Sequence, residues 1–343
     1  MKTSHCPREK LFTFSIGVTG RCNANCSYCH YFATRDRKEV AYDISDKQFI
    51  AYMKFIRYWC ETIAGVTSYR FSGGEPTLLG DRLFRLADIG YKLTGLRPFI
   101  LTAGKELNKE WVLRARESAI AHIFVSIENP IQPDKGAPDP NRVVDFIREF
   151  NSPTLPIVPG VCVVPNNCFK HLPEICNWFY TRLGRIPPLC EVNYSPYKCP
   201  SEIEWEDLKK VLPTVIRDHF HNTQLNIFSS IVPEYAYGGK DPYVFDLDLE
   251  NTQEINGINY KRKQSPLIRE LNTVHYPRLH CLQKNCPWKM FCKNTKWYWQ
   301  NDKNGFEKKI TDYCRFKRIL SDAYYRVIVG PSHPDTTCSI KLS

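Results

Sequence analysis

The sequence predicts an α/β fold built on a parallel sheet, and two patterns carry this prediction. Short apolar segments rich in β-branched residues, typical of buried strands, alternate with longer segments of helical periodicity from about residue 12 to residue 219. Polar or glycine-containing turns follow several of the strand-like segments. Strands that alternate with helices pair in parallel through right-handed crossovers. At 343 residues, the chain is long enough for one large domain of this class and a smaller appendage.

The first strand and the first helix have clear signals. Residues 12–18 are mostly apolar and run into a glycine, as expected of a buried strand. Ser45, followed three residues later by Gln48, is a capping box that predicts a helix start. From there Phe49 and Ile56 share one apolar stripe of the expected helix.

Five further strand–helix pairs are expected along the chain. The strands are predicted at residues 68–71, 99–102, 122–127, 157–164 and 190–194. The helices are predicted at residues 81–93, 108–118, 141–150, 169–183 and 202–219. After about residue 225 the alternation stops, and Asn256-Gly257 predicts a hairpin within residues 246–261. We therefore expect a main domain over residues 1–222 and a smaller C-terminal module over residues 223–343.

Composition and charge narrow the class of protein. The 43 % hydrophobic and 13 % aromatic content indicates a globular chain, and no stretch approaches the roughly 20 apolar residues of a membrane helix. The apolar segment 11–18 is a poor signal peptide, so we expect a cytoplasmic protein with no membrane partner. The net charge of +11 is spread along the chain. Nucleic acid is therefore an unfavoured partner, although a salt-dependent affinity for RNA would support it.

The chain has 15 cysteines, which in a reducing cytoplasm indicate metal or redox roles. Cys22, Cys26 and Cys29 are spaced so that their thiolates can converge on one object. Thiolates select iron–sulfur clusters, zinc or copper(I) over harder ions. A four-iron cluster normally takes four cysteines, so three would leave one iron open to a chelating molecule. A structural zinc site and unrelated buried thiols are the alternatives.

The three-cysteine loop, with Tyr28 before its last cysteine, resembles the signature loop of the radical S-adenosylmethionine (SAM) enzymes. The resemblance implies that the three cysteines bind a [4Fe–4S] cluster whose open iron is chelated by SAM, with Tyr28 beside the cofactor. It also implies reductive cleavage of SAM to a 5′-deoxyadenosyl radical. The fold implied is a partial (β/α)6 TIM-like barrel, which agrees with the strand count.

A second motif, Ser72-Gly73-Gly74-Glu75-Pro76, follows the next expected strand. Paired glycines let a backbone approach a ligand closely or take up positive φ. The segment matches the Gly-Gly-Glu-Pro motif of the radical SAM family, which implies that Gly73, Gly74 and Glu75 hold the amino group of SAM. A Gly-Gly turn alone is common, but one that follows a three-cysteine loop after one strand and one helix is specific.

Further candidate residues lie at later strand ends, where barrels of this kind carry their chemistry. Thr102 ends the third strand and Ser126 lies in a segment that resembles the Val-Ser-Leu-Asp-Gly-Pro stretch of peptide-modifying members, so both are expected near SAM. Arg142 fits an arginine that approaches the SAM carboxylate in relatives. A capping hydroxyl and a surface salt bridge are the plain alternatives for Thr102 and Arg142. Glu128 is a candidate general base, or a group that binds ribose or substrate.

Four cysteines gather near the C-terminus, and either zinc or an iron–sulfur cluster accepts such a set. The region resembles the SPASM and twitch modules of radical SAM maturases, but its first gap is longer and a Gly-Gly-x-Cys segment is absent. The resemblance implies one auxiliary [4Fe–4S] cluster. By their positions, Cys190, Cys199 and Cys338 are alternatives to Cys281 as one of its ligands. The expected ligands are Cys281, Cys286, Cys292 and Cys314.

The remaining cysteines are expected in the core or near the barrel mouth. Cys60, Cys162 and Cys176 fall on apolar faces, and free cysteine is among the most buried residue types. Cys162 or Cys168 is also a hypothetical hydrogen-atom donor to a substrate radical.

The functional prediction is an enzyme of the radical SAM type, an oxidoreductase or maturase that takes electrons from a flavodoxin or ferredoxin. Its expected substrate is a ribosomally made peptide or a protein residue, which it would cross-link, epimerise or oxidise. One alternative is a twitch-type dehydrogenase or rearrangement enzyme acting on a sugar or nucleotide. The other is a non-catalytic iron–sulfur or zinc protein, against which the Gly-Gly-Glu-Pro motif argues.

Overall fold

The computed structural model describes the part of the chain that holds the predicted strands and helices. The described residues are 12–27, 29, 41–62, 66–187, 189–191, 201–219 and 243–247, with positions 315, 319, 322, 323, 326 and 327. They fall into two compact units. The first holds those up to residue 163, residues 187 and 189–190, and residues 243–247; the second holds the others.

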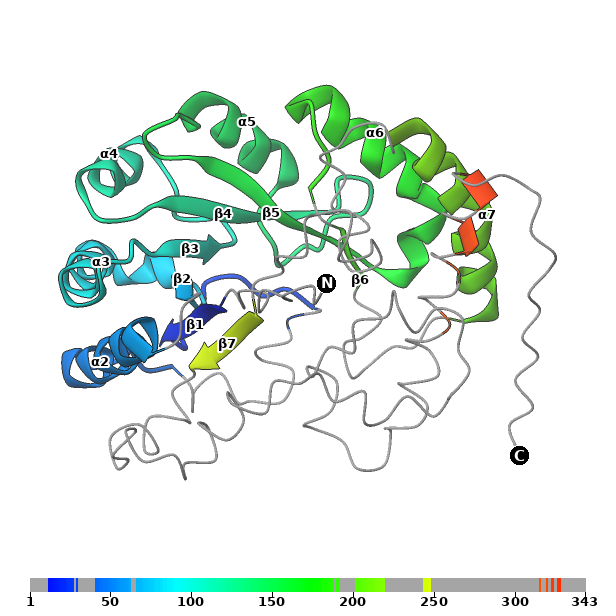
Figure 1. Cartoon of the computed structure of the whole chain (residues 1–343). Helices are drawn as coiled ribbons and strands as arrows, with labels where there is room; N and C mark the ends of the chain where they lie inside the picture. Colours follow the sequence, from blue (N-terminus) through cyan, green and yellow to red (C-terminus); the bar gives the residue numbers. More distant parts are fainter. Residues whose placement is uncertain are drawn as a thin grey trace, which may run out of the picture. The chain divides into compact units, whose positions relative to one another are not determined.

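A single sheet forms the centre of the first unit, and its strand order is β6-β5-β4-β3-β2-β1-β7. Every strand pair with a recorded register is parallel. The strands are β1 (Phe12–Thr19), β2 (Val66–Gly73), β3 (Phe99–Thr102), β4 (His122–Glu128), β5 (Ile157–Val164), β6 (Leu189–Glu191) and β7 (Tyr243–Leu247). Since β1 to β5 pair in parallel with their neighbours, their carboxyl ends meet at one edge of the sheet (Figure 1). The predicted α/β architecture is confirmed.

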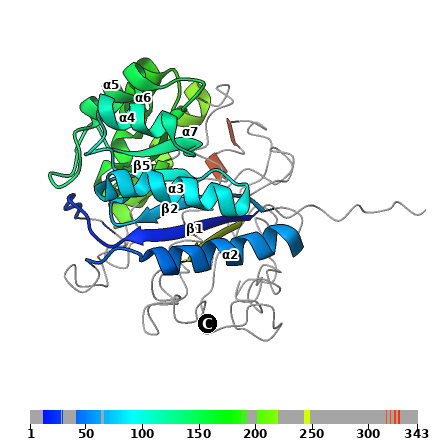
Figure 2. The ribbon, with the colours of Figure 1, turned by 90° about the vertical axis from the view of Figure 1, so that its left-hand side faces the viewer.

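Four helices of the first unit cover one face of this sheet (Figure 1, Figure 2). They are α2 (Asp46–Thr62), α3 (Asp81–Thr94), α4 (Lys109–Glu117) and α5 (Pro140–Phe150). The predicted capping box starts α2, because the Gln48 amide donates to Ser45 Oγ at 3.2 Å and the Ser45 amide donates to Gln48 Oε1 at 2.9 Å. A short 3₁₀ turn, η1 (Pro76–Leu79), links β2 to α3.

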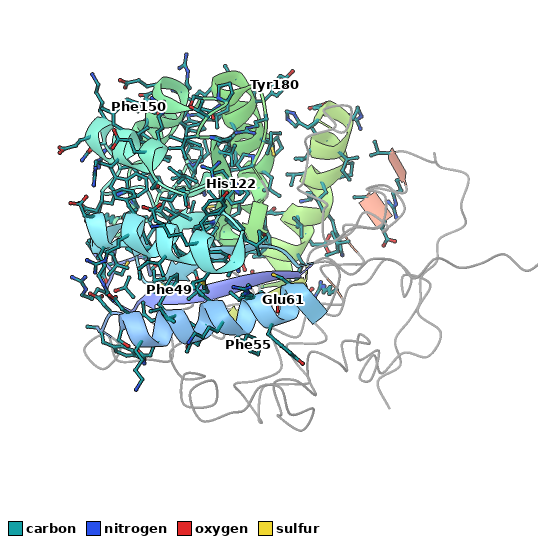
Figure 3. The ribbon with its side chains drawn as sticks, turned by 60° about the vertical axis from the view of Figure 1, so that its left-hand side comes forward. Phe49, Phe55, Glu61, His122, Phe150 and Tyr180 are labelled. Carbon is teal, nitrogen blue, oxygen red and sulfur yellow. The ribbon has the colours of Figure 1, made fainter. Side chains whose placement is uncertain are left out.

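The core lies between the helices and one face of the strands. Side chains alternate along a strand, so Phe14, which is 1 % exposed, turns to the helices while Ser15 turns to the opposite face. Phe49 and Phe55 come from α2 (Figure 3) and meet the strands edge to face, Phe49 on Phe71 and Phe55 on Phe14. These aromatic contacts fix the helix against β1 and β2, the two strands that carry the glycine and cysteine motifs.

The opposite face of the sheet is partly polar. Ser15 and Ser72, on β1 and β2, share a hydrogen bond of 2.8 Å between their hydroxyls. His122 on β4 (Figure 3) lies stacked on Phe99 of β3, with ring centroids 4.7 Å apart. Desolvation by these neighbours lowers the pKa of His122, so the ring is neutral at pH 7.

The second unit contains a 3₁₀ turn, η2 (Asn166–His171), and the helices α6 (Leu172–Leu183) and α7 (Glu202–His219). The sequence predicted one helix over residues 169–183, but α6 starts only at Leu172 because Pro173, which lacks an amide hydrogen, favours the first turn. Tyr180 of α6 (Figure 3) packs on His219 of α7 with ring centroids 6.0 Å apart. No described helix is long and apolar enough to cross a membrane.

The strand β7 differs from the prediction for residues 246–261. It begins three residues earlier, at Tyr243, and pairs in parallel with β1. The apolar sequence Tyr-Val-Phe at its start is typical of a strand added to a sheet edge. The Asn256-Gly257 turn lies outside the described residues, and the domain boundary near residue 222 stays a prediction.

Candidate functional site

The three-cysteine loop leaves the carboxyl end of β1, and its first residues are fixed by Asp43. Thr19 Oγ1 donates to Asp43 Oδ1 at 2.7 Å, and the Arg21 guanidinium makes two bonds to the same carboxylate at 2.8 and 2.9 Å. The Gly20 amide also donates to the carbonyl of Tyr42 at 2.9 Å. Burial by itself would raise the pKa of Asp43, but the bonds from Arg21 and Thr19 outweigh it and lower the pKa. The carboxylate is thus a charged anchor for the base of the loop.

The Gly-Gly-Glu segment lies directly against the start of the cysteine loop. The Gly74 amide donates to the Thr19 carbonyl at 2.8 Å, and the Glu75 amide donates to the Arg21 carbonyl at 2.7 Å. Gly73 has φ +118, and a Cβ there would lie 2.2 Å from the Thr19 oxygen. A Cβ on Gly74 would lie 2.2 Å from the Arg21 oxygen. Only glycine permits this approach, which brings the two sequence motifs into contact.

The Glu75 side chain is 1 % exposed and joins β2 to the end of β3. Its Oε1 accepts from the Thr77 amide at 3.1 Å, from Thr77 Oγ1 at 2.6 Å and from Thr102 Oγ1 at 2.7 Å. Its Oε2 accepts from the Ala103 amide at 2.9 Å. Thr102 in turn accepts from the Gly104 amide at 2.9 Å. Glu75 and Thr102, both predicted cofactor-binding residues, therefore belong to one buried network.

Glu128 and Ser126 lie on the same face of β4, since they are two residues apart. Glu128 is the last residue of the strand and is 4 % exposed, and its Oε1 accepts from the Asn129 amide at 3.0 Å. Asn129 is fully buried, and within the described part of the chain its Nδ2 has no hydrogen-bond partner. Ser126 is half-buried. The two candidate residues thus lie at the carboxyl end of β4.

The loop after β3 contacts the cysteine loop at Asn23. Lys105 Nζ donates to the Asn23 carbonyl at 2.8 Å, and Asn23 Nδ2 donates to the Glu106 carboxylate. Arg142, predicted to approach the SAM carboxylate, donates to the Lys105 carbonyl at 2.9 Å. Arg142 thus stabilises the loop after β3, and Lys105 of that loop contacts Asn23 of the cysteine loop.

The loop after β4 contacts the same cysteine loop on both sides of Cys26. The Asn25 amide donates to the Gly136 carbonyl at 2.9 Å, and the Ser27 amide donates to Asp134 Oδ2 at 3.1 Å. These supports were not predicted from the sequence. The only signal was Asp134-Lys135-Gly136, an Asx-turn pattern that marks a turn but no partner.

The cysteine loop fits the ligand set of a cluster. Cys22, Cys26 and Cys29 are half-buried and form no disulfide. No three His, Cys, Asp or Glu side chains of the described residues converge as ligands of one metal ion would. A cluster does not require such convergence, because each of its cysteines binds a separate iron. The close backbone approach at Gly74 leaves no room for a side chain between this loop and the Gly-Gly-Glu segment.

The other described cysteines include three whose thiols are fully buried. Cys162, Cys168 and Cys176 are 0 % exposed, and burial raises the pKa of Cys176 to about 12. Cys60 is only half-buried, at the end of α2, and burial raises its pKa. The core position predicted for Cys162 and Cys176 is confirmed, and Cys60 is more exposed than predicted.

The remaining predicted site residues are Tyr28 and the C-terminal cysteines, and these lie outside the described residues. For Cys190, in β6, the structure describes the backbone alone. The auxiliary cluster therefore stays a prediction. The residues outside the description are Tyr28, Cys199, Cys281, Cys286, Cys292, Cys314 and Cys338.

Comparisons with solved structures show where the same fold occurs. A structure described as native anSMEcpe with bound AdoMet and Kp18Cys peptide is similar with a TM-score of 0.63 at 18 % identity, over 91 % of this chain and 99 % of that chain. Streptococcus suis SuiB bound to the precursor peptide SuiA is similar with a TM-score of 0.52 at 14 % identity, over 83 % of this chain and 71 % of that chain. At these identities the likeness shows the fold.

Sequence comparisons point to the same family. A probable GTP 3′,8-cyclase of Methanothermobacter marburgensis is 28 % identical over 125 residues, which span 35 % of this chain and 36 % of that protein. Residues 16–178 match the Radical SAM superfamily, and they include the cysteine loop and the Gly-Gly-Glu segment that the structure brings together. This chain therefore contains a radical SAM domain.

Proposed function

We propose that this protein is a radical SAM enzyme that binds a [4Fe–4S] cluster through Cys22, Cys26 and Cys29. The observation that carries the proposal is the contact between its two motifs, in which the Gly74 and Glu75 amides donate to the Thr19 and Arg21 carbonyls. A structural zinc site would need no glycine platform held against its ligand loop. The contact therefore favours a cofactor seated across both motifs.

The family implies SAM as the second cofactor, and the chain's residues have distinct roles toward it in our proposal. When bound, the cluster and SAM supply a 5′-deoxyadenosyl radical that removes a hydrogen atom from the substrate. The backbone at Gly73 and Gly74 forms the platform for the SAM amino group, and Glu75 holds that platform in place through Thr102. Tyr28 and Ser126 complete the pocket, and Arg142 reaches the SAM carboxylate or orders the loop that contains Lys105.

We further propose a peptide or protein residue as the substrate, modified by hydrogen abstraction as an oxidoreductase or maturase would do. Two observations support this choice. The Val125-Ser126-Ile127-Glu128 segment resembles that of peptide-modifying members, and two of the structures that share this fold, one of anSMEcpe and one of SuiB, carry a peptide in their descriptions. An auxiliary [4Fe–4S] cluster on Cys281, Cys286, Cys292 and Cys314 would accept an electron or bind the peptide. The cytoplasmic location and a flavodoxin or ferredoxin reductant belong to the same proposal.

A nucleotide substrate is the second candidate, because the sequence relative is described as a probable GTP 3′,8-cyclase. That alignment covers about a third of each chain, so it supports the shared domain more than the substrate. An assay can separate the two candidates. Reconstituted enzyme with SAM and reductant is offered GTP or a cysteine-containing peptide, and 5′-deoxyadenosine is quantified. Stimulation above the substrate-free rate by the peptide alone supports the first candidate, and stimulation by GTP alone supports the second.

Cleavage of SAM itself is tested with a glycine pair. Gly74→Ala places a Cβ at 2.2 Å from the Arg21 oxygen, so we expect 5′-deoxyadenosine formation to fall at least about 100-fold. Gly95→Ala is the matched control, since Gly95 has φ +73 but no atom within 4 Å of its added Cβ. Its effect should be limited to about 1 kcal/mol of stability. Equal cleavage by wild type and Gly74→Ala would contradict the assigned platform.

A further inference from the structure

The segment Asp134-Lys135-Gly136 makes hydrogen bonds to the cysteine loop on both sides of its second cysteine, Cys26. Asp134 Oδ2 accepts from the Ser27 amide at 3.1 Å and from the Ser27 hydroxyl, and the Gly136 carbonyl accepts from the Asn25 amide at 2.9 Å. The contacts therefore flank Cys26 on both sides. All come from a loop more than 100 residues further along the chain.

The segment is itself held in shape by an Asx turn. Asp134 Oδ1 accepts from the Gly136 amide at 2.8 Å, and the Asp134 carbonyl accepts from the Ala137 amide at 3.0 Å. One carboxylate thus orders its own loop with one oxygen and the cysteine loop with the other. The two loops are coupled through a single side chain.

The approach of the two backbones is too close for any residue except glycine at position 136. A Cβ there would lie 2.0 Å from the Asn25 oxygen and 2.3 Å from its carbonyl carbon. Both atoms are backbone, so neither can move aside as a flexible side chain would. Gly136 is therefore required by the contact with the cysteine loop.

The Asp134 carboxylate is charged in this setting. Burial would raise its pKa, but the hydrogen bonds from Ser27 and Gly136 outweigh burial and lower it. A fixed negative charge near a redox group favours the more oxidised form, and charge and hydrogen bonding are known to set cluster potentials.

We infer that residues 134–136 form a clasp that holds the cysteine loop in its ligand-binding shape. Asp134 and Gly136 are its positioning residues, and the Asp134 carboxylate lowers the reduction potential of the cluster. This inference rests on the proposed cluster site but assigns a role to a loop outside both cofactor motifs. The clasp acts through Ser27 and Asn25 and does not itself supply a ligand.

Three substitutions separate the holding role from the charge. Asp134→Ala removes both the acceptor and the charge, and Gly136→Ala breaks the backbone contact without changing charge. Asp134→Asn keeps one acceptor oxygen for Ser27 and removes the charge, together with the oxygen that accepts from the Gly136 amide. Asp139→Asn is the matched control, because it removes the same charge five residues on while asparagine retains its role at the start of α5, where Asp139 accepts from the Asn141 amide at 3.0 Å.

The first readout is the rate at which a chelator strips iron from the reconstituted full-length protein under anaerobic conditions. We expect iron loss about tenfold faster in Asp134→Ala and Gly136→Ala, since each variant loses at least one hydrogen bond that holds the cysteine loop. The second readout is the midpoint potential of the SAM-free cluster, followed by electron paramagnetic resonance. It should shift to a more positive value in Asp134→Asn and stay at the wild-type value in Asp139→Asn.

Iron loss at the wild-type rate in both Asp134→Ala and Gly136→Ala would overturn the holding role. An unchanged potential in Asp134→Asn would overturn the electrostatic role. Thermal unfolding of each apoprotein shows whether a variant is folded. If Gly136→Ala does not fold, the conservative Asp134→Asn variant still tests the inference. A wild-type protein that takes up no iron would instead overturn the proposed function, and the inference with it.

Discussion

Thr102 on β3 donates a hydrogen bond of 2.7 Å to Glu75, which follows β2, in the buried layer directly beneath the cysteine and glycine motifs. Since Glu75 also accepts from Thr77 and Ala103, one carboxylate fixes the ends of two adjacent strands. This places the glutamate of the Gly-Gly-Glu segment in a supporting position, while the backbone of that segment faces the loop.

The Glu75 network predicts a large loss of stability on truncation. Glu75→Ala leaves buried donors without an acceptor, and we expect the free energy of unfolding to fall by about 3 kcal/mol or more. Thr102→Val removes one bond and should cost about 1 kcal/mol. Urea unfolding followed by circular dichroism measures both. Glu149→Ala, on an exposed position of α5, is the control and should change stability by less than about 0.5 kcal/mol.

Substitution of Tyr69 is predicted to raise the free energy of unfolding, in contrast to substitution of Glu75. Its hydroxyl is buried on the helix side of β2 and has no hydrogen-bond partner among the described residues, and burial raises its pKa. Tyr69→Phe removes this unpaired polar group, so we expect a gain of about 1 kcal/mol in the free energy of unfolding.

The same site predicts how Gly90 on α3 responds to substitution. A Cβ on Gly90 would lie 2.0 Å from the Tyr69 hydroxyl oxygen, so Gly90→Ala should destabilise the wild-type background. The Tyr69→Phe background removes the closest of these contacts and leaves the ring carbon Cζ at 2.9 Å, so Gly90→Ala should cost less there than in the wild type. A Tyr69→Phe variant less stable than wild type would show that the hydroxyl has a partner.

Asp43 predicts a pH dependence of stability. Its pKa in the folded protein lies below the usual 3.8, so its contribution is present above about pH 4 and is lost as the pH falls through the lowered folded pKa. Asp43→Asn should therefore be less stable than wild type near pH 7, and the difference should shrink below about pH 4. Arg21→Met removes the partner and should show the same convergence. A difference between wild type and Asp43→Asn that is constant from pH 7 to pH 3 would contradict this account.

Substitution of Glu128 is predicted to uncouple SAM cleavage from substrate turnover. If its carboxylate moves a proton on the substrate, Glu128→Gln keeps 5′-deoxyadenosine formation but lowers product formation by about 100-fold. The ratio of product to 5′-deoxyadenosine measures this uncoupling. Glu149→Gln serves as the control on an exposed position of α5. Full coupling in Glu128→Gln would remove Glu128 from proton transfer and leave it a role in binding.

Local sequence signals predicted most of the fold because they are short-range. The bounds of β3, β5 and α7 were predicted to the residue, and the Ser45 capping box started α2 as expected. Apolar alternation, caps and glycine turns act within a few residues, so one sequence contains them. The parallel pairing of β7 with β1 was missed because it depends on a contact about 230 residues apart.

The parts of the candidate site that have a short sequence pattern were also predictable. The cysteine spacing and the Gly-Gly-Glu segment were visible as patterns, and their contact follows from the adjacency of β1 and β2. The supports from Asp43, Lys105 and Asp134 were not visible, because a single charged residue in a polar loop has no periodic or spacing signal. Which loop such a residue contacts is decided by tertiary packing.

The most direct test of the central claim is an anaerobic count of iron and sulfide on reconstituted protein, made in parallel on a Cys22→Ala, Cys26→Ala, Cys29→Ala triple variant, with 5′-deoxyadenosine measured in both. The account predicts about eight irons in the wild type and about four in the variant, with SAM cleavage only in the wild type. About four irons with cleavage intact in the wild type would remove the auxiliary cluster alone. A wild-type protein that binds iron equally with and without the three cysteines, or that cleaves no SAM, would contradict the account.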